Sequence, residues 1–111
     1  MNYKILVVDD MIESLQVMVN FIQRSNPEYT IYQSNSSKQA LKIIRQTLPD
    51  LIITDWDMPE LDGIELIREL KADDNTKDIP VIMATGVMLT SDNLKKALET
   101  HERNTQIVLP N

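Results

Sequence analysis

Three aspartates stand where two apolar segments of the chain end, and they carry the chemistry that the residue pattern suggests first. Asp9 and Asp10 follow segment 4–8, and Asp55 follows segment 51–54. Short runs rich in β-branched residues are typical of strands buried on both faces, and such strands belong to parallel sheets. Ligands of these sheets bind beyond the carboxyl ends of the strands. If the two strands are neighbours, the three carboxylates share one small site.

Such a site needs a cation or a shared proton, because crowded carboxylates repel one another. Oxygen ligands without histidine or cysteine nearby favour a hard ion, Mg²⁺ or Ca²⁺. A carboxylate can also attack a phosphoryl group and form an acyl phosphate, and Asp55 is the first candidate for that role. Two plain structural alternatives exist. Asp55 could cap a loop, and Asp9 and Asp10 could open the first helix as its N-cap acids.

The elements that must position these residues alternate between strand and helix patterns. Strands are predicted over 4–8, 29–33, 51–54, 79–84 and 107–109, and helices over 12–25, 37–47, 63–72 and 94–99. Ser36 and Ser37 are candidate caps for the second helix. The apolar residues expected to face the core from the first three helices are Ile12, Leu15, Val19, Ile22, Leu41, Ile44, Leu48, Ile64, Ile67 and Leu70. Repeated strand–helix units predict an α/β fold with a parallel sheet and right-handed crossovers.

Three separated motifs resemble the receiver domain of two-component response regulators. They are Val7 to Asp10, Asp55 to Gly63 (Asp-Trp-Asp-Met-Pro-x-x-Asp-Gly) and Val81 to Thr85, in the order and spacing of that family from residue 3 to about residue 99. The resemblance implies a flavodoxin-like doubly wound sheet with strand order 2-1-3-4-5. It also implies a signalling domain that receives a phosphoryl group from a sensor histidine kinase or a phosphotransfer protein. Beyond self-phosphorylation and self-dephosphorylation, no enzymatic activity is expected.

The resemblance also assigns roles to individual residues. Asp55 would be the phosphoryl acceptor, and the Thr85 hydroxyl would donate to a phosphate oxygen. The expected cofactor is Mg²⁺, held by Asp9, Asp10, Asp55 and the backbone carbonyl of Asp57. Mg²⁺ usually keeps several waters and accepts substrate phosphate oxygens, which suits this ligand set.

The C-terminal end departs from the family pattern. Leu109-Pro110 replaces the usual Lys-Pro, Gln106 stands where an aromatic residue is common, and the sequence ends at Asn111, where a fifth helix would begin. Residues 1–111 are therefore predicted to form a single receiver domain, incomplete at its C-terminus and without the fifth helix. The alternative interpretation is a degenerate receiver that acts as a phosphorylation-independent protein-interaction module. A third, enzymatic interpretation takes Asp55 and Asp57 as the nucleophile and the acid/base pair of a haloacid-dehalogenase-type phosphatase. In that family, however, the motif usually lies on the first strand of a longer chain.

The charge and composition of the chain limit the classes of molecule that it is expected to bind. Seventeen acidic residues against eleven basic ones give a net charge of −6, which predicts that this domain binds neither nucleic acid nor an anionic membrane surface. No apolar stretch approaches the length of a membrane span, and there are no cysteines, so a cytoplasmic protein is expected. Without a fifth helix, part of strand 4–8 would be exposed, either Ile5 and Val7 or Leu6 and Val8. This exposure predicts self-association as a homodimer.

Overall fold

The computed structural model describes residues 2–55, 63–84 and 106–108, which form a parallel sheet covered by helices. The elements are β1 (Lys4–Val8), α1 (Ile12–Ser25), β2 (Thr30–Ser34), α2 (Ser37–Thr47), β3 (Leu51–Asp55), α3 (Gly63–Lys71), β4 (Val81–Ala84) and β5 (Gln106–Val108). The strands pair in the order β2-β1-β3-β4-β5, and every pairing is parallel. The predicted α/β, flavodoxin-like sheet is confirmed. The helix expected at 94–99 lies outside the described residues.

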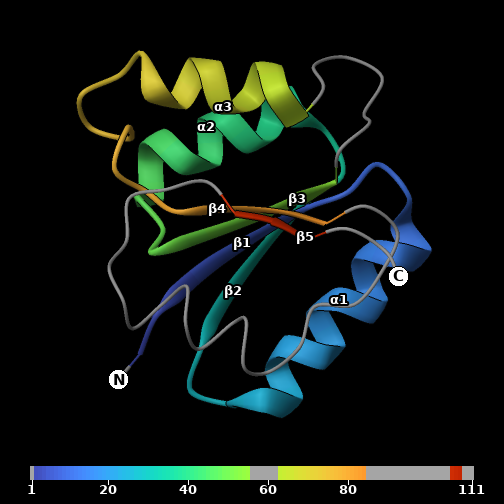
Figure 1. The fold of residues 1–111 in the computed structure, drawn as a ribbon. Helices are drawn as coiled ribbons and strands as arrows, with labels where there is room; N and C mark the ends of the chain where they lie inside the picture. Colours follow the sequence, from blue (N-terminus) through green and yellow to red (C-terminus); the bar gives the residue numbers. More distant parts are fainter. Residues whose placement is uncertain (1, 56–62, 85–105, 109–111) are drawn as a thin grey trace.

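The sheet is wound on both faces. Figure 1 shows α2 and α3 over one face and α1 over the other. Alternate strand residues therefore enter two cores. Beneath α1 lie Ile5, Val7, Leu15, Val19, Ile22, Leu51, Ile53 and Ile82. Beneath α2 and α3 lie Leu6, Val8, Ala40, Ile44, Ile52, Leu66, Leu70, Val81 and Met83. The strands read as continuous apolar runs because both of their faces are covered.

Two residues predicted to face the core are instead exposed. Ile12 is 61% exposed and Leu48 is 47% exposed. Ile12 opens α1 only four residues after β1 ends, so it lies at the edge of the sheet with no strand beneath it. Leu48 follows the end of α2 and has a left-handed backbone with φ 47°, so the helical spacing no longer directs it inward. Conversely, Leu66 is completely buried although the helical pattern did not single it out.

The exposure expected along β1 is also wrong. Ile5, Leu6 and Val7 are fully buried, and Val8 is 1% exposed. Three apolar residues of α1 pack against the face that was expected to be open. The buried β1 therefore offers no apolar surface for a homodimer, and self-association itself stays a prediction.

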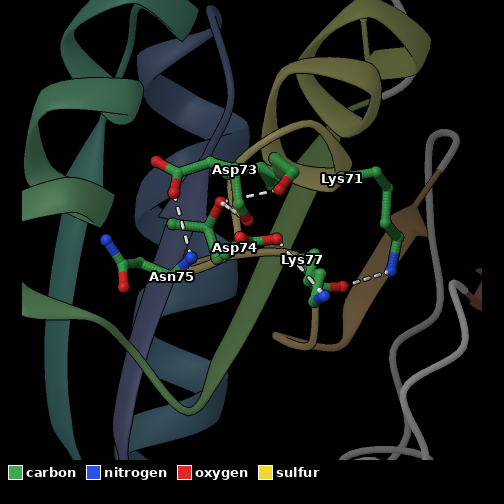
Figure 2. Close-up of polar contacts among 7 residues, drawn as sticks. Lys71, Asp73, Asp74, Asn75 and Lys77 are labelled. Atoms are coloured by element: carbon green, nitrogen blue, oxygen red, sulfur yellow. Dashed lines mark hydrogen bonds and ion pairs between the residues drawn. The ribbon is translucent and has the colours of Figure 1, made fainter.

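The connection between α3 and β4 is held by short polar contacts at the amino end of β4. Figure 2 shows the Asp73 carboxylate facing the backbone of Asn75, whose N–H donates to Asp73 Oδ1 at 2.9 Å. The buried Thr76 hydroxyl donates to the carbonyl of Leu70 at 2.7 Å and so satisfies an acceptor in the last turn of α3. These contacts lie at the edge of the sheet opposite the predicted site.

Candidate functional site at the carboxyl edge of the sheet

The sheet register brings the three acidic positions to one edge. Strands β1 and β3 are neighbours, and Val8 pairs with Thr54 as the last residues of their ladder. Asp9 and Asp55 each come one residue later, so the two backbones run side by side at this edge, with Asp10 next in the chain. On the other side of β3, Asp55 pairs with Ala84, the residue before Thr85. The shared acidic site was predicted on the condition that the two strands are neighbours, and β1 and β3 are indeed neighbours.

Burial and two hydrogen bonds fix the position of Asp9. It is only 8% exposed. Its N–H donates to the Ser34 carbonyl at 3.1 Å, which continues the contact between β1 and β2 by one step. Its Oδ1 accepts from the N–H of Met11 at 3.0 Å. A carboxylate that is nearly buried is costly unless it is hydrogen-bonded or paired with a cation. Its carboxylate oxygens are also the type of ligand that a hard cation such as Mg²⁺ prefers.

The helix-cap explanation of the acidic pair does not hold. The N-cap residue of α1 is Met11, and no side chain caps it. The bond from Met11 to Asp9 closes a turn before the helix begins, and Asp10 is half-buried beside it. By contrast, the predicted cap of α2 is confirmed, because Ser36 accepts from the N–H of Gln39.

The structure describes only part of the predicted site. The backbone of Asp55 is described, whereas Asp57 and Thr85 lie outside the described residues. Within the ranges that the structure covers, no three acidic or histidine side chains gather closely enough to hold a metal ion on their own. The described side chains of the ligand set are those of Asp9 and Asp10.

Two features of the edge were not found from the sequence. Ser34, at the end of β2, is buried and supplies the carbonyl that anchors Asp9. Met11 and Ile12 are 59% and 61% exposed and form an apolar rim directly after the acidic pair. The sequence could have indicated this rim, because Met11 and Ile12 follow the end of β1, where no strand residue lies beneath them.

Residues 5–106 match the family model described as the response regulator receiver domain. The chain belongs to this family. Receiver domains are signalling modules of two-component systems rather than classical enzymes, and they interact with histidine kinases or phosphotransfer proteins. The family generally binds Mg²⁺ at its phosphorylation site. None of the described helices of this receiver is long and apolar enough to cross a membrane.

Individual relatives agree with the family match. The receiver is 33% identical over 82 residues to chemotaxis protein CheY1 of Helicobacter pylori, covering 74% of this chain and 66% of the relative. It is 38% identical over 82 residues to the phosphate regulon transcriptional regulatory protein PhoB of Pseudomonas aeruginosa. This match covers 74% of this chain and 35% of PhoB. The matched region thus spans just under two thirds of the chemotaxis relative and about one third of PhoB.

A solved structure is similar in fold and in sequence. The N-terminal domain of a response regulator receiver protein from Methanoculleus marisnigri has a TM-score of 0.73 and 31% identity, covering 98% of this chain and 85% of that one. The predicted resemblance to receivers is confirmed by the family match and by this structural likeness.

Proposed function

We propose that this receiver accepts a phosphoryl group on Asp55 from a sensor histidine kinase or a phosphotransfer protein. The observation that carries the proposal is the register between β1 and β3, in which Asp9 and Asp55 each follow the last paired residues, Val8 and Thr54. Neighbouring acidic positions at the carboxyl ends of parallel strands are where this type of sheet binds ligands. The reaction would take place in the cytoplasm.

Asp55 would act as the nucleophile. One of its carboxylate oxygens attacks the phosphorus, the bond between phosphorus and the donor nitrogen breaks, and an acyl phosphate results. The Thr85 hydroxyl would donate to an oxygen of the transferred group. Water would later attack the same phosphorus, which returns Asp55 to a carboxylate and releases phosphate. Positioning and charge neutralisation account for most of the catalysis of phosphoryl transfer.

Mg²⁺ would be held by Asp9, Asp10, Asp55 and the backbone carbonyl of Asp57. When bound, the ion supplies positive charge opposite the phosphoryl oxygens. Asp9 supports this assignment because it is nearly buried and is oriented by the Met11 N–H, so one ligand is held rigidly before the ion arrives.

Adding Mg²⁺ is expected to change the fluorescence of Trp56 and to raise the melting temperature. Trp56 is the only tryptophan and directly follows Asp55. At ion concentrations of ten to a hundred times Kd, stabilisation of about 1.4–2.7 kcal/mol follows from mass action. Asp10→Asn should weaken both responses, whereas Asp74→Asn, at a side chain that is 95% exposed, should leave them intact. Failure of both signals to respond at millimolar Mg²⁺ would contradict the metal assignment.

Phosphoryl incorporation tests the function directly. The chain is incubated with Mg²⁺ and a small acyl-phosphate donor, and its intact mass is measured. One added phosphoryl group, located at Asp55 by proteolysis after reductive trapping, is the expected result. An unchanged mass with both the small donor and a panel of phosphorylated histidine proteins would contradict the proposal.

The apolar rim after the acidic pair is expected to contact the donor protein. Met11 and Ile12 are exposed within three residues of Asp9, and exposed apolar groups next to a reactive site typically contribute to binding. Ile12→Asp should lower the rate of transfer from a phosphorylated donor protein about tenfold, which corresponds to roughly 1.4 kcal/mol. The rate from a small donor should change little.

Val17→Asp provides the matched control for this rim. Val17 is 70% exposed on the same helix but lies beyond the first turn and on another side of it. Equal loss in both variants would mean that added negative charge, rather than the rim, slows transfer. Loss with the small donor as well would mean that Ile12→Asp damages the site itself.

A further inference from the structure

A buried hydroxyl at the start of α2 is left without a hydrogen bond. Ser37 is the first residue of α2 and is 1% exposed. Across the part of the chain that the structure describes, its Oγ is the only buried side-chain oxygen or nitrogen with no hydrogen-bond partner. A buried hydroxyl gives up its bonds to water, so leaving it unpaired destabilises a fold. This cost points to a role for the hydroxyl beyond the folding of the ligand-free chain.

The neighbouring serines have roles in the local structure. The Ser34 hydroxyl donates to the carbonyl of Ser36 at 2.7 Å. Ser36 in turn accepts from the N–H of Gln39 as the cap of α2. The turn from β2 to α2 is therefore completed by these two side chains, and the hydroxyl of Ser37 takes no part in it.

The buried side of α2 places Ser37 over the carboxyl edge of the sheet. The buried residues of this helix are Ser37, Ala40 and Ile44, and Ala40 belongs to the same core as Val8 of β1. Because α2 starts beyond the end of β2 and joins two parallel strands, it runs back along the sheet from this edge (Figure 1). Three helix residues advance about 4.5 Å and two strand residues about 6.6 Å. One step from Ala40 to Ser37 thus corresponds to the step from Val8 to Asp10.

A hydrogen bond between the ends of β1 and β2 brings the same two positions together independently. The N–H of Asp9 donates to the carbonyl of Ser34 at 3.1 Å. Asp10 is the next residue on one side of this bond, and Ser37 follows three residues later on the other side. Ser37 and Asp10 therefore lie at the same corner of the sheet.

Asp10 is a second polar group at this corner without a partner. Its side chain is half-buried, and within the described ranges its carboxylate accepts no hydrogen bond and forms no ion pair. Asp9, by contrast, accepts from the N–H of Met11. A partly buried carboxylate is stabilised by a donor or a cation, and a serine hydroxyl supplies one O–H donor. The two unpartnered groups are chemically complementary.

We propose that Ser37 is a positioning residue of the metal site, whose hydroxyl donates to the Asp10 carboxylate when a cation binds. The proposal rests on the proposed function, in which Asp10 is a ligand of Mg²⁺. Carboxylates that bind a metal ion usually accept a further hydrogen bond, which orients them toward the ion. The Met11 N–H already orients Asp9 in this way. Ser37 does the same for Asp10, so each acid of the pair has its own donor.

Ser37→Ala is expected to weaken cation binding about tenfold, the lower end of the effect of removing such a partner. Mn²⁺, which takes oxygen ligands as Mg²⁺ does, is titrated into the chain and followed by the relaxation of water protons. Mg²⁺ is then measured by its displacement of Mn²⁺. Ser25→Ala is the matched control, because its exposed hydroxyl donates to Phe21 at the far end of α1. The control should bind within about twofold of the unmodified chain.

Melting without the ion separates this role from a role in folding. With all metal removed by a chelator, Ser37→Ala should melt at the same temperature as the unmodified chain or higher, because the hydroxyl that it loses had no partner. A lower melting temperature would mean that the hydroxyl is already bonded in the ligand-free fold. That result would overturn the proposal.

A double-mutant cycle tests whether Ser37 acts through Asp10. In a chain that carries Asp10→Ala, adding Ser37→Ala should change the affinity for Mn²⁺ by no more than about twofold, since the acceptor is already gone. A second tenfold loss would show that Ser37 acts on the site by another route and would overturn the proposal.

The binding data also separate this proposal from the metal assignment. An unmodified chain that binds neither ion would overturn both. An unmodified chain that binds both ions, with an affinity that Ser37→Ala keeps in full, would overturn the role of Ser37 alone.

Discussion

Replacing Asp55 with asparagine is expected to abolish phosphoryl incorporation, both from a small donor and from a phosphorylated protein. The amide keeps the size of the side chain at the end of β3 but cannot attack phosphorus. Because no other group can form the same acyl phosphate at this position, the loss should be complete within the detection limit of intact-mass measurement. Mg²⁺ binding should weaken as well, since one carboxylate ligand becomes neutral.

Asp74→Asn is the matched control, because it makes the same chemical change at a side chain that is 95% exposed and remote from the carboxyl edge. It should be phosphorylated at the same rate as the unmodified chain. Incorporation that persists in Asp55→Asn would move the acceptor to another residue. Absence of incorporation in every variant, with a folded sheet, would instead favour the phosphorylation-independent interaction module.

Ile22→Ala is expected to destabilise the receiver by about 2–5 kcal/mol, the range for truncating a buried isoleucine. Ile22 is completely buried beneath the sheet among Val19, Ile5 and Ile53. Domains of this kind have free energies of unfolding of roughly 5–15 kcal/mol, so this single change would remove a large share. Urea unfolding followed by circular dichroism measures it.

Ile12→Ala makes the same truncation on the same helix and should change the free energy of unfolding by no more than about 0.5 kcal/mol. The difference follows from exposure, 61% for Ile12 against none for Ile22. Comparable losses at the two positions would mean that Ile12 is covered in solution. That result would also withdraw Ile12 from the proposed apolar rim.

Element positions could be predicted well from this sequence because local signals and global packing agree. The apolar runs of β1 and β3 are bounded by polar residues, and Ser36 caps α2 where the helical period begins. Helix bounds for α1 and α2 match the predicted ranges, and β2 is displaced by one residue. The strand order came from the family resemblance, since periodicity alone does not say which strands are neighbours.

Side-chain burial near helix ends could not be predicted in the same way. Helical spacing treats Ile12 and Ile22 alike, but only Ile22 has a strand beneath it. The fixed position of Asp9 could not be predicted from the sequence either, because it depends on the carbonyl of Ser34 at the end of β2 and on the N–H of Met11 in the turn before α1. The roles of Asp57 and Thr85 still rest on the resemblance.

The purely parallel pairing of the sheet has a consequence for how the receiver acquires its function over time. Parallel neighbours cannot be joined by a tight turn, so each strand contact closes a long stretch of chain, as in the bond from Lys4 to Asp50 across 46 residues. Folding dominated by such distant contacts is comparatively slow. Asp9 and Asp55 come together only when β1 and β3 have paired. Under the proposed function, a nascent or partly folded chain would therefore have no complete acceptor site, and a donor protein would phosphorylate only chains whose sheet has formed.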